Sequence, residues 1–157
     1  MGLGNPGSEY EHTYHNIGAW SLAYFKTYAE KDGLLHQLIF MQPDSFMNES
    51  GRAVSGWLKN KNFGPESLVI IHDDSDLNSG SYKFIKGGGS AGHKGLESII
   101  NQLGTEEFWR LRIGIRDPGE PVRKKAMDFV LRKFPKDLEP VFEQVCAQAW
   151  QEIKKLL

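Results

Sequence analysis

The sequence predicts a single α/β domain with a mixed, mostly parallel twisted sheet that is flanked by helices. The segment 68–71 is continuously apolar and rich in β-branched residues, which is typical of a strand buried on both faces. Segments with helical spacing of apolar residues alternate along the chain with short strand-like segments. The 157 residues, of which 39% are hydrophobic, suffice for one core but not comfortably for two.

The individual elements follow from the spacing of apolar residues. Helical spacing predicts five helices, over residues 17–30, about 48–62, 93–103, 122–134 and 138–157. Continuous or alternating apolar runs predict four strands, over residues 38–41, 68–71, 82–86 and 109–115. Alternation in the last strand predicts that Arg110 and Arg112 face outwards, while Leu111, Ile113 and Ile115 face the core.

Turn and cap residues delimit these elements. Asn48 or Ser50 is suited to cap the second helix, and Gly104 is expected just after the third. The strand at 68–71 is followed by the polar segment 72–76. We expect that segment outside the carboxyl end of the strand, where open α/β sheets bind ligands.

The chain is interpreted as one domain, residues 1–157. A parallel core of this kind is expected to contain an apolar strand ahead of Gly2, yet only Met1 precedes that glycine. The segment 33–38 is also short for a connection that must cross a sheet. We therefore expect that residues of this strand and of this connection are missing from the sequence, rather than that the fold does without them.

Charge and cysteine usage narrow the classes of partner. The formal net charge is −1, but residues 83–136 carry 12 basic and 6 acidic side chains. A segment with a net charge of +6 is typical of a phosphate-binding surface, although a merely solvated face is about as compatible. The single cysteine, Cys146, excludes an intramolecular disulfide and fits the reducing cytoplasm. No apolar run approaches the length of a membrane helix, so we expect no membrane association.

The glycines at positions 2, 4 and 7 form a G-x-G-x-x-G pattern, which favours dinucleotide binding only when a strand precedes it. The sequence has no such strand, and Pro6 removes one backbone N–H group. A Rossmann-type oxidoreductase is therefore a weak alternative. The glycines can equally serve a turn that places Asn5 at the rim of a site.

Several polar residues at the ends of apolar elements are candidates for chemistry. His15 can act as a general base, and Asp73 can orient it and stabilise the imidazolium. Asn5 or Asn48 can donate a hydrogen bond to a developing oxyanion. Each of these residues also has a structural interpretation as a cap or turn former, which is at least as common. No nucleophile accompanies them, so a hydrolase built from this set would activate water directly.

Metal and nucleotide sites are less well supported. The loop from Asp74 has Ser79 and Ile85 where an EF-hand requires glycine and glutamate. The segment Gly87–Gly92 precedes a predicted helix and can hold phosphate through backbone N–H groups, but it lacks the G-K-[ST] ending of a P-loop. We expect neither a metal nor a cofactor.

Taken together, the motifs resemble those of the bacterial-type peptidyl-tRNA hydrolase family. The matching segments, in order, are Gly2-Leu-Gly-Asn-Pro-Gly7 with Tyr10, Thr13 and His15-Asn16; Phe46-Met-Asn-Glu-Ser-Gly51; His72-Asp73 with Asp76-Leu77 and Gly80; Gly87-Gly-Gly-Ser-Ala-Gly-His-Lys-Gly-Leu96; and Phe108 with Arg110-Leu-Arg-Ile-Gly-Ile115. The resemblance runs from Gly2 to about Phe134. Five ordered motifs are highly specific, unlike any one of them alone.

The resemblance implies a monomeric cytoplasmic enzyme that hydrolyses the ester between a peptide and the terminal ribose of tRNA, so that the tRNA is recycled in translation. His15 would be the general base and Asp73 the residue that holds it. The resemblance also implies a group of residues that bind the substrate: Asn5, Tyr10, Met47, Asn48, His93 and Lys94. Contacts with tRNA phosphate are expected from Arg112, Lys83 and Lys86.

Three positions depart from the family pattern. The lysine that would share a phosphate with Arg112 is replaced by Ile85, which lies between Lys83 and Lys86. Lys94 replaces an asparagine, and its charge is expected to depress the pKa of His15. Tyr14 replaces an arginine. Lys94 and the basic segment 83–136 leave a second hypothesis open, a non-catalytic relative that binds tRNA or other RNA without cleaving it.

Overall fold

The computed structural model of the chain describes residues 1–119 and 129–157. Its sheet contains β1 (Val69–Asn78), β2 (Tyr82–Lys86) and β3 (Trp109–Arg116), in the order β1-β3-β2. β1 pairs with β3 in parallel and β2 pairs with β3 antiparallel, so the predicted mixed sheet is confirmed. The long connection that parallel pairing requires is supplied by β2 and helix α3, which lie between β1 and β3 in the chain.

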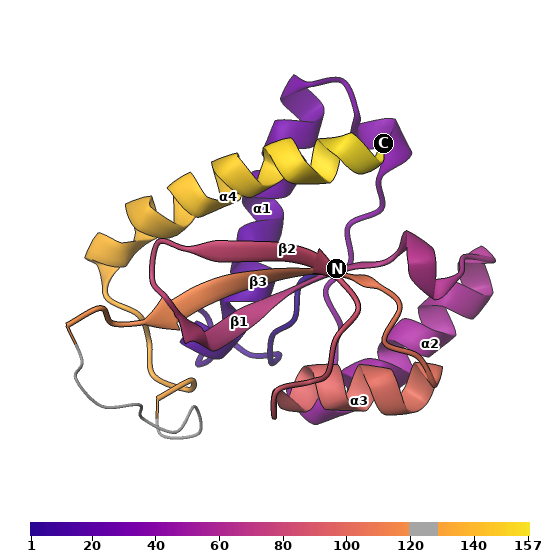
Figure 1. Cartoon of the computed structure of the whole chain (residues 1–157), viewed down its shortest axis with the longest axis horizontal. Helices are drawn as coiled ribbons and strands as arrows, with labels where there is room; N and C mark the ends of the chain where they lie inside the picture. The colour runs from indigo at the N-terminus through magenta and orange to yellow at the C-terminus, as the bar shows by residue number, and fades with distance from the viewer. Residues whose placement is uncertain (120–128) are drawn as a thin grey trace.

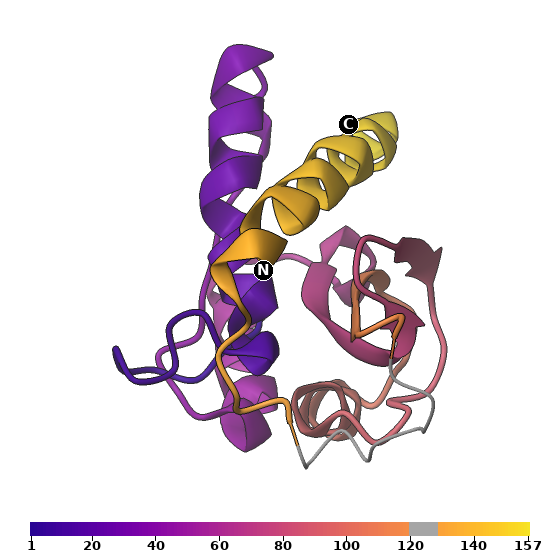
Figure 2. The ribbon, with the colours of Figure 1, turned by 90° about the vertical axis from the view of Figure 1, so that its left-hand side faces the viewer.

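Helices cover both faces of this sheet (Figures 1 and 2). The α-helices of the described residues are α1 (Ile17–Lys31), α2 (Ser50–Lys61), α3 (Lys94–Leu103) and α4 (Glu139–Ile153). α1 packs on α4, and α2 packs on α3. Ile71 belongs to the core beneath the first pair, and its neighbour Ile70 to the core beneath the second. Consecutive strand residues point to opposite faces, so the sheet is the middle layer of three. None of the described helices is both long and apolar enough to cross a membrane.

Two predicted elements differ from the structure. Residues 38–41 follow the short 3₁₀ helix Leu35–Gln37 and form no strand; the Met41 carbonyl accepts one hydrogen bond, from the Gly2 N–H at 3.0 Å. The helix predicted at 122–134 lies largely outside the described residues. Its described end, residues 129–134, is a turn that reaches an isolated bridge between Thr13 and Lys133, so the helical prediction is wrong there.

The first three residues lie along the free edge of β1. The Met1 amino group donates to the Val69 carbonyl at 2.8 Å, and the Ile71 N–H donates to the Met1 carbonyl at 2.9 Å. The Leu3 N–H then donates to the Ile71 carbonyl at 3.0 Å, and Gly2 and Ile71 form a parallel bridge. Residues 1–3 therefore occupy the sheet position in which the sequence leads us to expect an apolar strand.

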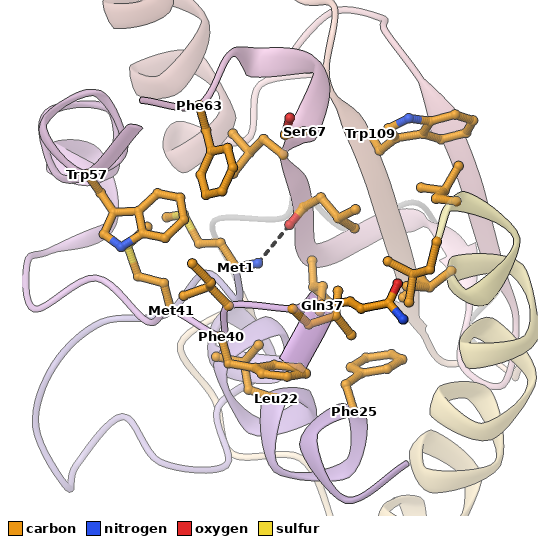
Figure 3. Close-up of a pocket in the computed structure, with 18 of the residues that line it drawn as sticks. Met1, Leu22, Phe25, Gln37, Phe40, Met41, Trp57, Phe63, Ser67 and Trp109 are labelled. Carbon is orange, nitrogen blue, oxygen red and sulfur yellow. Dashed lines mark hydrogen bonds between the residues drawn. The ribbon is translucent and has the colours of Figure 1, made fainter. Parts of the chain in front are cut away.

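An apolar hollow of about 470 Å³ opens beside Met1 (Figure 3). Phe25, Phe40, Trp57 and Trp109 are among the side chains that line it. Burial at the edge of this hollow lowers the pKa of the Met1 amine to about 5. The amine is therefore mostly neutral at pH 7, which lessens the cost of placing it in apolar surroundings.

A close approach between α1 and β1 fixes where the site residues lie. A Cβ added to Gly18 would be 2.2 Å from the Ile71 carbonyl oxygen, so only glycine allows the helix to cross the strand there. The turn that precedes α1 is thereby held beside β1.

Candidate active site

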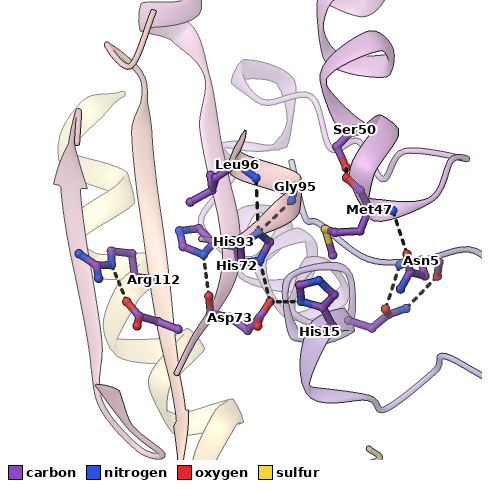
Figure 4. Close-up of polar contacts among 12 residues, drawn as sticks. Asn5, His15, Met47, Ser50, His72, Asp73, His93, Gly95, Leu96 and Arg112 are labelled. Carbon is purple, nitrogen blue, oxygen red and sulfur yellow. Dashed lines mark hydrogen bonds and ion pairs between the residues drawn. The ribbon is translucent and has the colours of Figure 1, made fainter. Parts of the chain in front are cut away.

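Two histidines meet on one carboxylate oxygen (Figure 4). His15 Nδ1 lies 2.8 Å from Asp73 Oδ1, and His93 Nε2 lies 2.9 Å from the same oxygen. His15 belongs to the 3₁₀ helix Tyr14–Asn16 that leads into α1, while His93 is the N-cap of α3. The predicted pair of His15 and Asp73 is thus brought together, and His93 is added to it.

Asp73 lies within β1 and not in a loop beyond it. The sequence predicts that the strand ends at residue 71, but β1 continues to Asn78, and Asp73 stands opposite Ile113 of β3. The polar residues remain in the strand because β3 satisfies their backbone groups and nearby side chains bind their side chains. The placement of the polar segment outside the strand was therefore wrong.

The carboxylate is charged and the histidines donate to it. Burial alone would raise the pKa of Asp73, but the charges and hydrogen bonds of His93 and His15 hold that pKa well below its usual range. Burial also lowers the pKa of His15, yet the charge and hydrogen bond of Asp73 outweigh it and raise the pKa above its ordinary 6.5. With the proton on Nδ1, the Nε2 lone pair of His15 is available as a base.

His93 is locked in one orientation by three hydrogen bonds. Its Nδ1 accepts from the Gly95 and Leu96 N–H groups at 3.1 and 3.4 Å, which caps α3. A nitrogen that accepts carries no proton, so the proton lies on Nε2 and is donated to Asp73. His93 therefore supports Asp73 and is not free to act as a second base at the same time.

His72 is a third histidine of the site that the sequence did not single out as a site residue. Its Nδ1–H donates to the Asp73 carbonyl at 2.7 Å, and its ring meets His93 edge-on at 4.9 Å between centroids. Burial lowers the pKa of His72 to about 3, so it stays neutral. The available sequence signal was its position directly before Asp73.

Asn5 connects the glycine-rich N-terminal segment to the start of α2. Its Oδ1 accepts from the Met47 N–H at 2.8 Å, and its backbone exchanges two hydrogen bonds of 2.9 Å with the Asn16 side chain. The Asn5 amide nitrogen has no protein partner within the described part of the chain. In Figure 4, His15 is drawn between Asn5 and Asp73.

The remaining predicted substrate residues lie around this core. Met47 is buried, and its sulfur would be 2.5 Å from a Cβ added at Gly95. Asn48 is exposed on the 3₁₀ helix Met47–Glu49, and neither it nor Ser50 caps α2 with its side chain. Tyr10 packs edge-on against Phe46.

Lys94 does not act on His15 as the sequence suggested. Its ammonium is 3.0 Å from the Glu97 carboxylate and the side chain is 65% exposed, so solvent and Glu97 screen the charge. The pKa of His15 is raised, not depressed. The expected effect of Lys94 was therefore wrong.

The basic residues divide between the two faces of the sheet. Lys83 stands opposite Arg112 and shares its face, whereas Lys86 stands opposite Trp109 and shares the other. Arg112 is already bonded to Asp74, at 2.6 Å between Nε and Oδ2. Arg110 was expected to face outwards but is 2% exposed, because the segment 87–92 covers that face of β3.

The histidine, carboxylate and arginine side chains described above surround a small open hollow of about 110 Å³. Its lining includes His15, Asp73, Arg110, Arg112 and the segment 89–94. The hollow thus offers one base and two guanidinium groups.

The two histidines and the carboxylate are also residue types that can bind a metal ion. Ligand atoms of His15, Asp73 and His93 all lie within 4.8 Å of one another. A metal would need the Nε2 lone pair of His93, but that nitrogen carries the proton as long as Nδ1 caps α3. The hydrogen bonds therefore favour the present histidine–carboxylate arrangement over metal ligation.

Comparisons with known proteins agree on one family. The family model described as peptidyl-tRNA hydrolase matches residues 1–157. A peptidyl-tRNA hydrolase from Wolbachia of Brugia malayi (strain TRS) is 39% identical, over 92% of this chain and 87% of that protein. One from Neisseria meningitidis (serogroup A, strain Z2491) is 36% identical, over 100% and 88%. The crystal structure of peptidyl-tRNA hydrolase from Acinetobacter baumannii is 32% identical, covers 98% of this chain and 84% of that one, and has a TM-score of 0.79.

Proposed function

Because the chain belongs to the peptidyl-tRNA hydrolase family, we propose that it hydrolyses the ester of peptidyl-tRNA and releases free peptide and reusable tRNA. The observation that carries this proposal is the hydrogen bond of 2.8 Å between His15 and the buried Asp73. Because this hydrogen bond uses Nδ1, the lone pair of His15 Nε2 stays available. The His15 side chain is 12% exposed and lines the hollow.

The chemistry follows from these protonation states. His15 Nε2 takes a proton from a water molecule as the water oxygen bonds to the ester carbonyl carbon. Asp73 stabilises the imidazolium that forms. Collapse of the tetrahedral intermediate breaks the bond to the ribose oxygen, and His15 returns its proton to that oxygen. An alkoxide leaves more readily than an amine, so no covalent nucleophile is needed.

Asn5 is suited to stabilise the oxyanion. Its Oδ1 is held by the Met47 N–H, so the amide is fixed, and its N–H₂ group has no partner among residues 1–119 and 129–157. A donor held in advance costs no reorganisation when negative charge develops on the carbonyl oxygen. We assign the neighbouring Asn48, Tyr10, Met47, His93 and Lys94 to binding of the peptidyl and terminal nucleotide parts.

The acceptor strand of tRNA is proposed to lie along the Arg112 face of the sheet. Lys83 and Arg112 are cross-strand neighbours there, so Lys83 can provide the second cation that Ile85 does not. Lys86 lies on the opposite face and would contact phosphate only beyond the sheet edge. We further propose that the enzyme acts as a monomer in the cytoplasm, where peptidyl-tRNA is formed and where stalled ribosomes release it, and that it needs no metal or other cofactor.

The proposed role of Asn5 can be tested without disturbing its structural hydrogen bond. In Asn5→Asp, a carboxylate oxygen still accepts from the Met47 N–H, but the N–H₂ donor is lost and a negative charge faces the carbonyl. We expect kcat to fall by roughly 10²–10³-fold, the usual cost of removing one oxyanion donor. Steady-state hydrolysis and thermal unfolding are the measurements. A variant with normal kcat would show that the Asn5 amide does not contact the reacting carbonyl.

The function itself is tested by incubating the purified protein with N-acetyl-aminoacyl-tRNA and following release of the labelled N-acetyl amino acid. The proposal expects catalytic turnover at neutral pH. Tight, salt-sensitive tRNA binding without release would instead identify a non-catalytic RNA-binding relative. Lys94, which motivated that alternative, pairs with Glu97 and leaves His15 and Asp73 intact.

A further inference from the structure

Arg110 is a buried cation whose bonding is incomplete. It is the largest fully buried side chain of the described residues, and its guanidinium has five N–H donors. Nη1 donates to the Gly89 carbonyl at 2.7 Å, and the group lies 4.6 Å from the centroid of the Phe108 ring. Nε and Nη2 are buried and have no partner in the described part of the chain. Buried guanidinium groups are normally paired with an anion. The two nitrogens without a partner therefore indicate that Arg110 binds an anion from outside the protein.

Strand register places this cation in the proposed active site. Arg110 and Arg112 are two residues apart in β3 and therefore share one face. Both line the hollow that contains His15 and Asp73. Arg112 is already bonded to Asp74, whereas no salt bridge of the described residues involves Arg110. Arg110 is thus the guanidinium of the hollow that still lacks an anion.

The cover over Arg110 is a backbone segment almost without side chains. A Cβ added at Gly88 would be 3.9 Å from Arg110 Nη1, and one added at Gly89 would meet nothing within 4 Å. Gly87, Gly88 and Gly92 have φ values of 76°, 102° and 81°, which other residues rarely adopt. Phosphate chemistry suits such a place, because peptide N–H groups and a guanidinium can bind the same anion.

The substrate indicates which anion this is, given the function proposed above. The peptide has no free C-terminal carboxylate, because that group forms the scissile ester. The anion closest to the ester in every peptidyl-tRNA is the phosphate on the 5′ side of the terminal nucleotide. We propose that Arg110 and the segment 87–92 form the subsite for this phosphodiester, and that the subsite anchors the terminal nucleotide while His15 acts on its ester.

The test compares two Arg→Met changes on the same strand. Arg116, whose Nε donates to Asn78 at 2.8 Å, does not line the hollow and provides the control. Affinity for deacylated tRNA is measured over a range of salt concentrations. Arg110→Met is expected to weaken binding about tenfold or more and to reduce the slope of log K against log salt by about one. Arg116→Met should keep the wild-type slope. An unchanged slope in Arg110→Met, or equal losses in both variants, would overturn the proposal.

A second measurement uses the wild-type protein and does not depend on how the variant folds. The ¹⁵N resonance of Arg110 Nε is followed while adenosine 5′-monophosphate or adenosine is added. The nucleotide should shift this resonance and the nucleoside should not. Inorganic phosphate is added in a third titration. If it shifts the resonance as strongly as the nucleotide does, and the salt slope of tRNA binding is the same in Arg110→Met as in the wild type, the site binds a free anion and the proposal is wrong. Turnover of N-acetyl-aminoacyl-tRNA by wild-type protein separately reports on the proposed function.

Discussion

Replacement of His15 by alanine is expected to lower kcat for peptidyl-tRNA hydrolysis by roughly 10²–10⁴-fold, the usual contribution of a general base. The loss arises because the imidazole that accepts the proton of water is then missing from the hollow. The fold should persist, because Asp73 keeps its hydrogen bond to His93 and the side chain of His15 lines the hollow, where it is 12% exposed. Single-turnover release of N-acetyl amino acid and the circular-dichroism melting curve together measure both effects.

The matched control is His36→Ala. His36 is exposed in the 3₁₀ helix Leu35–Gln37 and does not line the active-site hollow, so its removal should leave kcat unchanged. A His15→Ala protein that is folded and fully active would refute the assignment of the base. An inactive His15→Ala protein that has also lost its cooperative melting transition would point to a structural role instead.

Replacement of Asp73 by asparagine is expected to reduce kcat by a similar or larger factor and to change the pH profile. In a Ser-His-Asp triad the corresponding change lowers kcat about 10⁴-fold, because the histidine takes the wrong tautomer. In the wild-type protein Asp73 raises the pKa of His15 above 6.5. The base must be neutral to act, so activity should fall as the pH drops through this raised pKa. In Asp73→Asn the residual activity should fall only at a lower pH.

The pH profile of kcat therefore distinguishes the loss of the Asp73–His15 interaction from a general loss of structure. Asp44→Asn, at an exposed position that does not line the active-site hollow, should have the wild-type rate and the wild-type acidic limb. If Asp73→Asn lost activity but kept the wild-type acidic limb, Asp73 would not be the group that sets the pKa of His15.

Much of the fold is predictable because periodicity reports burial. The helices at 17–31 and 94–103 and the strand at 82–86 match their apolar spacing. Residues 38–41 have the composition of a strand, but a strand also needs a neighbour to pair with, and local sequence does not contain that information. For the same reason Arg110 was placed on the correct face of the strand but wrongly expected to be exposed: alternation shows that two faces differ, whereas the cover over one of them comes from a distant segment.

The sequence predicted the residue types of the site and one pair within it, but not the other contacts. His15, Asp73 and Asn5 were identified by their chemistry and by family motifs, and the first two are indeed in contact. The second histidine on Asp73 and the buried His72 could not be inferred, because both depend on how α3 lies against β1. The effect of Lys94 was misjudged because its distance from a screening partner, Glu97, is a property of helix α3.

The carboxylate oxygen shared by two histidines also bears on how the protein acquires its activity. The bonds from Asp73 to His15 and His93 span 58 and 20 residues of chain. Contacts of such separation form only after the entropy of closing the intervening loops has been overcome. An isolated α2–α3 pair, or α1 alone, therefore contains no oriented base. Recovery of hydrolysis during refolding is a chemical readout of the moment at which α1, β1 and α3 are all in place.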